Sequence, residues 1–526
     1  MLDAFFFQRT QVTPDAPALW VAGETLSYAQ LARRASAVAR SLAALPAPSF
    51  GSAAQRADVE GAERCLLLSH RHADTYAGLL GILSAGMSYV PLNPTFPLSR
   101  NVAVANRSRS KTLLVGAECD AQLHALLPML DPHIRVLRIS DAIAAAPTHP
   151  PVSRLPRSDS DTAYVLFTSG TTGVPKGVRI SHASATAYVE RQVQLDPAEA
   201  SARFSQFFDL TFDLSVHDMF VCWANGGCLY VPPSSDPLYM AQFAIEHRLT
   251  HWGSVPSAAN FLRQFRKLKP DSLPDVRVAM FCGEALPTVL ARHWAAAAPN
   301  CRIRNLYGPT EATISCMRFE VERDWLAGFD GGVVPLGWSL PGEETVIVGE
   351  DGEAVLDGEK GELLLGGPQL AQGYISDNPA DHARFFERAF AGRQATRWYR
   401  TGDLVSACAR DGMRFHGRID TQVKIRGYRI ELQDVEHALQ QCSDASMTAV
   451  VAWPRDALGM PSGLVGFVTG AAASPETIAA ACRKALPAYA VPNRIVKLET
   501  FPVNVNGKVD RQRLLSFCEG GIAEAA

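Results

Sequence analysis

Short apolar runs alternate with amphipathic segments over the first 150 residues of the chain. Apolar positions at helical spacing predict a helix over Leu26–Leu45, with Ser27 as its cap. The stretch Gly78–Pro94 predicts a helix, a turn at Gly86 and then a strand that Pro91 and Pro94 end. Strands that alternate with helices favour α/β layers around a parallel sheet. Other runs suit buried strands, namely Cys65–His70, Thr112–Ala117, Ile134–Ser140 and Ala163–Phe167.

The second half of the chain repeats one pattern, an apolar strand that ends in a turn. This pattern occurs at Gly226–Pro233, Thr250–Ser257, Val276–Glu284 and Ile303–Thr313. From Gly331 the composition shifts to glycine-rich short strands, which predict a small β subdomain with hairpin turns. A smaller region of mixed helices and strands follows. We therefore expect a large N-terminal α/β domain of mixed and parallel sheets flanked by helices, with a β subdomain, and a small α+β C-terminal domain.

Composition and charge narrow the class of protein. The 526 residues are too many for one ordinary core, so at least two domains are expected. The formal net charge of −3 gives no electrostatic case for binding nucleic acid or an anionic membrane. The 11 cysteines form no C-x-x-C pair, and we see neither a signal peptide nor a membrane-spanning stretch. A cytoplasmic, reduced enzyme is the expectation.

One segment, Phe167–Gly177, has the composition of a phosphate-binding loop. It reads FTSGTTGVPKG and joins a predicted buried strand to the next element. Glycines let backbone N–H groups approach an anion, hydroxyls donate to its oxygens, and Lys176 adds a point charge. The segment is not a Walker A loop, because its glycine and lysine are not adjacent and no Ser or Thr follows the lysine.

Acidic and polar residues follow several predicted strands. Asp213 lies in the otherwise apolar run Phe207–Phe220, and its buried carboxylate needs a partner. A substrate ammonium is one candidate, and capping of a helix that begins near Leu214 is the alternative. Tyr307 could stack on a base or pack in the core. Asp403 could accept from the hydroxyls of a ribose or occupy a turn.

Ten motifs in the chain resemble those of the adenylate-forming enzymes, and within them the adenylation domains of nonribosomal peptide synthetases and their free-standing relatives. They are LSYAQL, ILSAGMSYVPLNP, FTSGTTGVPKG, FDLSVHDMF, NLYGPTEAT, GELLLGGPQLAQGY, YRTGDL, GRIDTQVKIRG, LPAYAVP and NVNGKVDR. One such motif is weak evidence, whereas ten in the family's order and approximate spacing are specific. The resemblance covers nearly the whole chain.

The resemblance implies a two-step reaction that uses ATP and Mg²⁺. A carboxylate attacks the α-phosphate of ATP to give an acyl-adenylate, and a carrier-protein phosphopantetheine thiol then takes the acyl group. It implies catalytic roles for Lys508 and Thr310 and a Mg²⁺-binding role for Glu311. The implied ATP-binding residues are Thr168, Ser169, Gly170, Thr171, Thr172, Lys176, Gly283, Asn305, Tyr307, Asp403, Phe415 and Arg418.

The resemblance also implies a mobile C-terminal domain. Asp420 matches the family's hinge, which divides the chain into an N-terminal core, 1–419, and a C-terminal domain, 420–526. The C-terminal domain would rotate between the two half-reactions, so that Lys508 leaves the site and Gln422–Gly427 enters it. No condensation signature and no carrier segment occur, so we expect a free-standing enzyme that meets its carrier protein in trans.

The substrate expected from the resemblance is a small or medium α-amino acid. Asp213 stands where amino-acid-activating members keep the carboxylate that pairs with the substrate ammonium. His217 and Ser254 could bond a polar side chain, unless His217 bonds Asp218 or the backbone instead. By family register, the pocket residues besides Asp213 are Leu214, His217, Ser254, Met280, Cys282, Leu306, Ile314 and Ser315.

Other functions stay open. FDLSVHD and FCGEALP are similar to D-alanine–carrier-protein ligases of cell-wall modification, although differences in the pocket favour a secondary-metabolite route. An acyl- or aryl-CoA ligase would resemble the rest of the chain but generally lacks Asp213. A non-catalytic nucleotide-binding protein on this fold is a third possibility, against which Lys176, Glu311, Asp403 and Lys508 argue.

Overall fold

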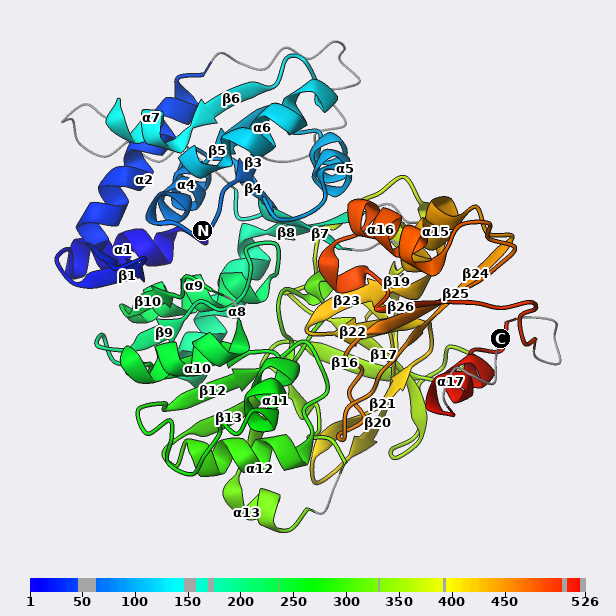
Figure 1. The fold of residues 1–526 in the computed structure, drawn as a ribbon. Coiled ribbons are helices and arrows are strands. Elements are labelled where there is room, and N and C mark those ends of the chain that lie inside the picture. The colour runs from blue at the N-terminus through cyan, green and yellow to red at the C-terminus, as the bar shows by residue number, and fades with distance from the viewer. Residues whose placement is uncertain are drawn as a thin grey trace. The chain divides into compact units, whose positions relative to one another are not determined.

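The computed structural model divides the chain into two compact units. It describes residues 1–45, 63–145, 158–168, 175–234, 236–329, 332–390, 394–503 and 509–520. Unit 1 consists of Met1–Pro94, Val104–Phe167 and Gly177–Ile419. Unit 2 consists of Thr95–Ala103, Thr168–Lys176 and Asp420–Ala526. Figure 1 labels the helices and strands of both units.

A mixed sheet lies near the N-terminus of the chain and confirms the expected α/β layers. Its central strands β7, β4, β3, β5 and β6 are parallel, and β18 pairs antiparallel with β8. The strands in spatial order are β18 (Gly373–Ile375), β8 (Lys176–Ser181), β7 (Thr162–Thr168), β4 (Ser88–Leu92), β3 (Arg64–Leu68), β5 (Thr112–Val115) and β6 (Arg135–Arg138).

Helices with apolar faces accompany this sheet. Helix α2 (Tyr28–Ala43) begins as the sequence predicts, because Ser27 accepts from Gln30 N and the Gln30 side chain accepts from Ser27 N in a capping box. Helix α2 packs on α4 (Ala73–Ser84) and α7 (Ile139–Ala144) (Figure 1). The other helices of this region are α5 (Leu98–Ser108) and α6 (Asp120–Leu126).

The strand that Pro91 and Pro94 were predicted to end does stop between these two prolines. Strand β4 continues to Leu92, and Pro91 pairs with Leu67 of β3. On the other side, β4 pairs with β7 through Tyr89 and Tyr164. A proline in a strand costs a ladder hydrogen bond only where its missing N–H would have donated. The short pairing with β7 makes Pro91 tolerable in this strand.

A second sheet carries most of the residues expected to have a function. Its strands from β13 to β1 are parallel, and β14, β15 and β2 are antiparallel to their neighbours. The order is β15 (Trp338–Ser339), β14 (Met317–Val321), β13 (Arg302–Tyr307), β12 (Val278–Phe281), β11 (His251–Ser254), β9 (Arg203–Ser205), β10 (Cys228–Val231), β1 (Pro17–Val21) and β2 (Glu24–Ser27).

Helices also pack around this second sheet. Trp223 of helix α9 (Leu214–Asn225) is fully buried. It donates its indole N–H to Ala18 O of β1, which ties the helix to the sheet. A continuous apolar core joins residues of both sheets. The helices are α1 (Ala4–Val12), α8 (His182–Leu195), α9 (Leu214–Asn225), α10 (Pro237–Glu246), α11 (Pro256–Gln264), α12 (Thr288–Ala297) and α13 (Arg323–Ala327).

The glycine-rich region forms the expected antiparallel β subdomain. Its strands are β16 (Glu344–Val348), β17 (Lys360–Gly366), β20 (Thr396–Cys408), β19 (Phe385–Arg388) and β21 (Gly412–Arg418), with the short helix α14 (Pro379–His382). Strand β20 pairs with β17, β19 and β21. The long β20 therefore lies at the centre of this subdomain and holds Asp403, which is a strand residue and not a turn residue.

Unit 2 beyond Asp420 has its own apolar cores and the expected α+β composition. A hairpin, β22 (Gln422–Ile425) and β23 (Tyr428–Glu431), precedes a sheet of β24 (Met447–Ala452), β25 (Leu464–Thr469) and β26 (Arg494–Lys497). Helices α15 (Leu432–Ser443), α16 (Pro475–Ala485) and α17 (Arg511–Glu519) supply Leu439, Ile478 and Leu514 to these cores.

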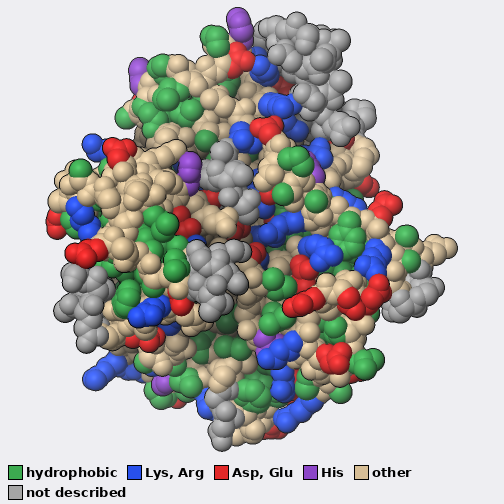
Figure 2. Space-filling model, turned by 90° about the vertical axis from the view of Figure 1, so that its right-hand side faces the viewer, with side chains coloured by type: hydrophobic (Ala, Val, Ile, Leu, Met, Phe, Trp, Pro, Cys, Tyr) green, Lys and Arg blue, Asp and Glu red, His purple; other side chains and the backbone are tan. Residues whose placement is uncertain are grey.

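The surface mixes charges of both signs. On the face drawn in Figure 2, basic and acidic side chains are interspersed, in keeping with the net charge of −3. Within the described ranges, no helix is both long and apolar enough to cross a membrane.

Gly81 sets the distance between α2 and α4, and its substitution tests this packing. A Cβ there would lie 2.7 Å from Val38 Cβ and 2.9 Å from Ala35 O. Alanine improves helix propensity by at most about 1 kcal/mol, and overpacking costs typically about 1–3 kcal/mol. We therefore expect Gly81→Ala to lower the urea midpoint of unfolding.

The matched control for this prediction is Gly328→Ala at the C-terminal end of α13. The nearest atom to its added Cβ lies at 3.7 Å, and its φ of −93° suits any residue. Stability within about 0.5 kcal/mol of the parent is expected for this surface change. Equal effects of the two substitutions would contradict the packing account.

Candidate active site

The carboxyl ends of parallel strands bring together the residues expected to have a function. Strands β11, β12 and β13 run parallel and end at Ser254, Phe281 and Tyr307. Residues that follow such ends meet at one edge of the sheet, where open α/β sheets bind their ligands. The residues expected to contact ATP or substrate in unit 1 come from this edge, from the start of α9 and from the β subdomain.

Asp403 is the centre of a buried polar cluster. The Tyr307 hydroxyl donates to Asp403 Oδ2 at 2.5 Å, and Arg418 Nη1 donates to Oδ1 at 2.6 Å. Asp403 and Arg418 are directly opposed across β20 and β21. Burial and the Asp403 charge raise the pKa of Tyr307 well above its ordinary value, so the hydroxyl remains a donor. The structure thus brings Tyr307 to a pair of residues on neighbouring strands that lies about a hundred residues further along the chain.

Asn305 presents an acceptor without a partner. Its amide Nδ2 donates to Pro335 O at 2.8 Å, which fixes the orientation of the side chain. Its Oδ1 is buried and has no hydrogen-bond partner within the described ranges. Gly283 follows β12 with a φ of 93°, and Phe415 on β21 is half-buried against the core. A buried acceptor without a partner suits an amino group on a bound ligand.

Glu311 is completely buried in the turn that follows β13. The Tyr374 hydroxyl donates to Glu311 Oε1 at 2.6 Å, and Tyr374 in turn contacts the Tyr399 hydroxyl at 3.3 Å. Thr310, the first residue of the short helix Thr310–Ala312, is partly exposed. The described residues include no group of three or more His, Cys, Asp or Glu that could hold a metal.

The turn after Glu311 is strained. Thr313 and Ile314 have φ values of 52° and 72°, and a β-branched residue such as Ile314 rarely adopts such values. Gln369 holds this turn, because its Nε2 donates to Ser315 O at 2.8 Å and to Ala312 O at 3.3 Å. Thr313 Oγ1 donates back to Gln369 O at 2.5 Å. Strain of this kind persists only where the surroundings determine the conformation.

Asp213 is buried at the first turn of α9. It occupies the N-cap position with helical backbone angles, and its side chain accepts no capping bond from the described backbone. The helix begins at Leu214, as the capping alternative expected, but Asp213 does not cap it through its side chain. Asp209 plays a local role, since it accepts from Asn93 Nδ2 at 2.9 Å and from Thr211.

His217 bonds neither Asp218 nor the backbone in the described contacts. Its Nδ1 lies 2.7 Å from the Tyr188 hydroxyl, which receives a long 3.4 Å hydrogen bond from Ser315 Oγ. Burial lowers the pKa of His217 to about 4, although Asp196 opposes this shift. His217 is therefore neutral at pH 7, and Tyr188 is the partner that the sequence did not indicate.

The other predicted pocket residues are buried apolar or internally bonded side chains. Ser254 Oγ accepts from Trp252 Nε1 at 2.8 Å and donates to Val255 O at 3.2 Å, so its hydroxyl is used within the protein. The apolar members, each no more than 4% exposed, are Leu214, Met280, Cys282, Leu306 and Ile314.

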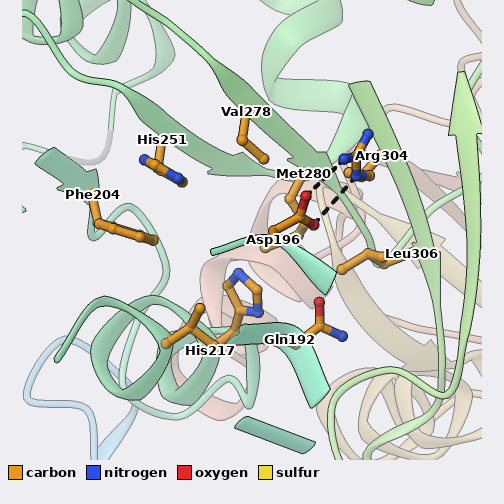
Figure 3. A pocket seen from close by; sticks show the side chains of 10 residues that line it. Gln192, Asp196, Phe204, His217, His251, Val278, Met280, Arg304 and Leu306 are labelled. Atoms are coloured by element: carbon orange, nitrogen blue, oxygen red, sulfur yellow. Dashed lines mark hydrogen bonds and ion pairs between the residues drawn. The ribbon is translucent and has the colours of Figure 1, made fainter. Parts of the chain in front are cut away.

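A small cavity of about 30 Å³ lies among the residues of α8, α9 and strands β9 and β11–β13 (Figure 3). Three of its lining residues, His217, Met280 and Leu306, belong to the predicted pocket. The sequence did not indicate the others, which are Gln192, Asp196, Phe204, Val221, His251, Val278 and Arg304. Gln192 is 3% exposed, and its Nε2 has no hydrogen-bond partner in the part of the chain that the structure describes.

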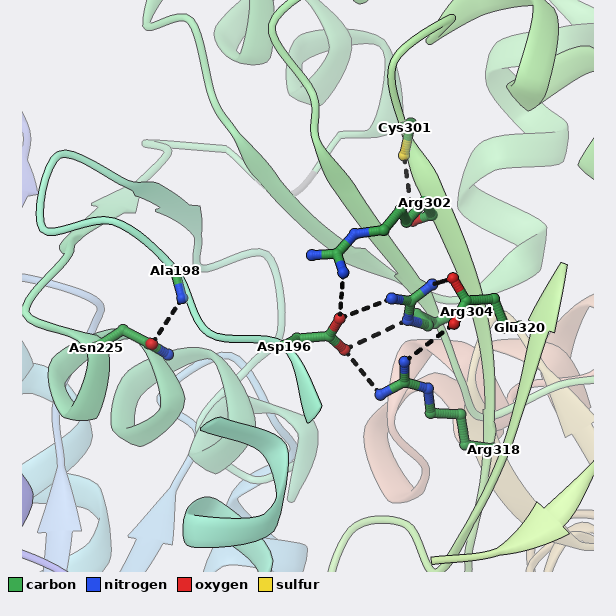
Figure 4. A network of polar contacts seen from close by, with 8 residues as sticks. All are labelled: Asp196, Ala198, Asn225, Cys301, Arg302, Arg304, Arg318 and Glu320. Atoms are coloured by element: carbon green, nitrogen blue, oxygen red, sulfur yellow. Dashed lines mark hydrogen bonds and ion pairs between the residues drawn. The ribbon is translucent and has the colours of Figure 1, made fainter. Parts of the chain in front are cut away.

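Asp196 joins three guanidinium groups beside this cavity (Figure 4). Arg304 donates through Nη2 at 2.7 Å, Arg318 through Nη1 at 2.9 Å, and Arg302 lies at 3.4 Å. Glu320 pairs with Arg304 and Arg318. Burial opposes ionisation of Asp196, but the Arg304 hydrogen bond and the arginine charges outweigh it and lower the Asp196 pKa. This Asp196 cluster fixes the end of α8 against β13 and β14.

Several predicted residues lie in unit 2 or outside the described residues. Five predicted residues lie outside the described residues, namely Ser169, Gly170, Thr171, Thr172 and Lys508. Thr168 ends β7, and its Oγ1 is buried without a hydrogen-bond partner in the described part of the chain. Lys176 begins β8 and is 1% exposed. Asp420 is the first residue of unit 2 after Ile419, and its Oδ1 accepts from Gln422 N at 3.2 Å.

Comparison with known proteins identifies relatives of the whole chain. The model of the AMP-binding enzyme family matches residues 6–375, and that of the AMP-binding enzyme C-terminal domain matches residues 434–508. The D-alanine–D-alanyl carrier protein ligase of Bacillus licheniformis is 30% identical over 96% of this chain and 97% of its own length. A linear gramicidin synthase of Brevibacillus parabrevis is 31% identical over the whole chain, which spans only 10% of that protein.

A solved structure resembles this one over nearly its full length. The Vibrio cholerae adenylation domain AlmE, crystallised with glycyl-adenosine-5'-phosphate, has a TM-score of 0.84 and 29% identity. The similarity covers 99% of this chain and 98% of that one. The predicted resemblance and the α/β fold are thus confirmed.

Gln369 should be essential to the strained turn. Gln369→Leu keeps the size of the side chain but leaves the carbonyls of Ala312, Thr313 and Ser315 without its donors. Buried groups that lose their partners cost about 1–3 kcal/mol, so we expect a loss of that size in urea unfolding. Gln369→Glu also removes the amide donor and should be at least as harmful. Parent-like stability of both variants would exclude this role.

The two buried histidines should make the protein sensitive to acid. Burial lowers the pKa of His217 to about 4 and that of His251 to about 3, against the charge of Asp196. Between pH 6.5 and about 4 the unfolded chain binds protons that the folded chain does not, so stability should fall with pH. His251→Phe keeps an aromatic ring stacked on Phe204, whose ring centroid lies 3.9 Å from that of His251. The urea midpoint of this variant should therefore fall less steeply with decreasing pH than that of the parent. An unchanged pH dependence would contradict the assignment.

Proposed function

The chain belongs to the AMP-binding enzyme family, and from this premise we propose that it activates an α-amino acid and transfers it to a carrier protein. In the first step the amino-acid carboxylate attacks the α-phosphate of ATP, which gives an aminoacyl adenylate and releases pyrophosphate. In the second step a phosphopantetheine thiol displaces AMP and forms a thioester. One relative matched over 97% of its length is named for D-alanine and a carrier protein, and a similar structure contains glycyl-adenosine-5'-phosphate.

The observation that carries this proposal is the buried carboxylate of Asp213. It is 8% exposed at the first turn of α9, next to pocket residue Leu214, and it does not cap the helix through its side chain. A buried carboxylate stabilises a substrate ammonium that would otherwise be costly to desolvate. Acyl- and aryl-CoA ligases have no ammonium to bind, so Asp213 favours an amino acid.

The nucleotide would lie against β13, β20 and β21. Asn305 Oδ1 supplies the acceptor for the adenine amino group, and Tyr307 and Phe415 supply flat faces beside the base. Asp403 accepts from the ribose hydroxyls, and Arg418 and Tyr307 hold its carboxylate in place. Gly283, with its φ of 93°, lets the backbone after β12 approach the nucleotide.

Glu311 is the residue that would hold Mg²⁺. The ion usually takes one or two protein carboxylates together with substrate phosphates, so a single buried glutamate fits it. The hydrogen bond from Tyr374 to Oε1 orients the carboxylate. When bound, Mg²⁺ neutralises charge on the phosphates. Thr310, one residue before, places a hydroxyl donor for the α-phosphate at the same turn.

The remaining problem in the first step is the repulsion between an attacking carboxylate and a triphosphate. Catalysis of such a step depends on positioning and on fixed positive charge. We assign the β- and γ-phosphates to Lys176 and to the loop residues Thr168, Ser169, Gly170, Thr171 and Thr172. We assign to Lys508 the bridge between the amino-acid carboxylate and the α-phosphate, as the family resemblance implies.

The amino-acid side chain would occupy the pocket between α9 and strands β11–β13. Its walls are the residues expected from the sequence, Leu214, His217, Ser254, Met280, Cys282, Leu306, Ile314 and Ser315. Met280 and Leu306 limit its length, which supports a small or medium side chain. Gln369 holds Ile314 and Ser315 in their strained turn and so fixes one wall.

The second step requires the C-terminal domain to move, and Asp420 is the proposed hinge. The proposal is supported by the division of the chain into compact units, which falls between Ile419 and Asp420. We propose the domains 1–419 and 420–526, with a carrier protein that binds in trans. We also propose that the protein acts in a secondary-metabolite pathway and that it is located in the cytoplasm.

A specific observation favours D-alanine as a second candidate substrate. The D-alanine–D-alanyl carrier protein ligase of Bacillus licheniformis matches over 97% of its length, and it is therefore similar in extent to this chain. A methyl side chain also fits a pocket that Met280 and Leu306 shorten. Comparison of D- and L-alanine in the same assay separates this candidate from the broader proposal.

The decisive measurement is amino-acid-dependent ATP–pyrophosphate exchange with all common L- and D-amino acids. Alkyl and aryl acids without an amino group serve as controls. We expect a strong response to one amino acid or to a small group of similar ones. A response confined to acids without an amino group would move the chain to the acyl or aryl ligases. No exchange with any acid, despite ATP binding, would overturn the proposal.

Asp213→Asn tests the ammonium partner within the same assay. The amide keeps the size of the side chain but removes its charge, and charged hydrogen bonds contribute about 1.5–3 kcal/mol. We expect kcat/KM for the amino acid to fall roughly 10- to 100-fold, with the KM for ATP unchanged. An unchanged preference for amino acids over the matching acids without an amino group would remove Asp213 from the pocket.

A further inference from the structure

The cavity of Figure 3 extends the predicted amino-acid pocket inward from the edge of the sheet. Met280 and Leu306 lie near the carboxyl ends of β12 and β13 and belong to the pocket. Val278 and Arg304 lie two residues earlier on the same strands, on the same face, and line the cavity too. Two residues of a strand span about 7 Å. The cavity is therefore the inner end of the pocket, and His217 lies where the two meet.

The hydrogen bonds around His217 determine which of its nitrogens carries the proton. Ser315 Oγ donates to the Tyr188 oxygen, and His217 Nδ1 at 2.7 Å is the acceptor that the described contacts offer to the buried Tyr188 proton, so we assign that proton to the bond with Nδ1. A neutral imidazole that accepts at Nδ1 carries its proton at Nε2. Burial keeps His217 neutral, with a pKa of about 4. Nε2 of His217 is therefore a hydrogen-bond donor.

Gln192 adds a second donor to the cavity. Its side chain is 3% exposed, lines the cavity from α8, and carries a buried Nε2 that has no partner among the described residues. A buried amide N–H without an acceptor costs about 1–3 kcal/mol. In native proteins such a group usually marks a place where a ligand or a water molecule binds.

The charged wall of the cavity has no acceptor to spare. Each oxygen of Asp196 already accepts from or pairs with two arginine nitrogens. The Asp196 cluster contains one more guanidinium than carboxylate, because Glu320 is its second acid. A positively charged side chain would therefore meet net repulsion there, and an uncharged donor would find no free acceptor.

We infer that the inner end of the pocket selects an amino acid whose side chain ends in a hydrogen-bond-accepting oxygen, and that Gln192 is a specificity-determining residue that donates to this oxygen. The inference rests on the proposed function and names its substrate class. A volume of about 30 Å³ admits a group of one or two heavy atoms. A terminal hydroxyl fits this volume whole, and a carboxamide or carboxylate would place its accepting oxygen in it while the rest of the group stays in the outer pocket.

The experiment compares each oxygen-bearing amino acid with an apolar one of similar shape in ATP–pyrophosphate exchange. The pairs are serine with 2-aminobutyrate, threonine with valine, asparagine and aspartate with leucine, and glutamine and glutamate with norleucine. A site built to bond a polar group strongly rejects the analogue without it. We expect the preferred oxygen-bearing member to exceed its apolar partner in kcat/KM by at least about 100-fold.

Gln192→Met tests the donor itself. Methionine keeps the length of the side chain but cannot donate. The ratio of kcat/KM for the oxygen-bearing amino acid to kcat/KM for its apolar partner should therefore fall by roughly 10-fold or more, while the KM for ATP stays constant. Gln192→Glu keeps the shape and exchanges the donor for an acceptor, so it should also abolish the preference. Gln194→Met is the matched control, because Gln194 is exposed on the same helix, and it should change neither quantity.

The possible outcomes separate the inference from the function on which it rests. Equal or better use of the apolar partners, or a preference for D-alanine over every oxygen-bearing amino acid, would overturn the inference and leave amino-acid activation intact, with the cavity holding water only. An unchanged preference in both Gln192 variants would do the same. Exchange with no amino acid at all would overturn the proposed function instead. Thermal unfolding and the KM for ATP show whether each Gln192 variant is folded.

Discussion

The side chain of Gln369 stabilises the turn on which the active site depends. Two residues of this turn, Thr313 and Ile314, have positive φ values that cost free energy. Fully buried Gln369 offsets that cost with hydrogen bonds to the carbonyls of the turn, and Thr313 donates back. Because Gln369 belongs to the segment before β18, the turn is fixed by a part of the chain more than fifty residues away. Glu311 and Ser315 are therefore held in fixed positions on one rigid segment.

A buried charge cluster plays the corresponding role at the opposite end of the pocket. Asp196 ends α8, and its arginine partners come from β13 and β14, so the cluster fixes the position of the helix against the sheet. Buried ion pairs contribute little net stability, since desolvation offsets their attraction. What this one provides is a defined distance between Gln192 on the helix and Leu306 on the strand.

The sequence indicated elements and single residues better than the contacts between them. Local signals were sufficient for α2, because the capping box at Ser27 involves residues three apart. The two prolines located the end of β4, whereas the pairing of Pro91 with β3 is a property of the sheet and not of the strand. Asp403 and Tyr307 were singled out separately, while their hydrogen bond depends on two strands far apart in the sequence. Gln192 and Gln369 carry no local signal, since a glutamine in a helix or loop is ordinary, and only burial and the missing or remote partners distinguish them.

The hydrogen bonds from Ser315 through Tyr188 to His217 all point in one direction, and this has an evolutionary consequence. A substrate that donates rather than accepts would require His217 to move its proton to Nδ1, which would force the Tyr188 and Ser315 hydroxyls to turn as well. An apolar residue in place of His217 would leave the buried Tyr188 hydroxyl without this acceptor, and phenylalanine in place of Tyr188 would leave Ser315 Oγ without its acceptor there. A change of substrate polarity therefore has to pass through paired substitutions, so these positions should vary together among descendants of this enzyme that acquire new substrates.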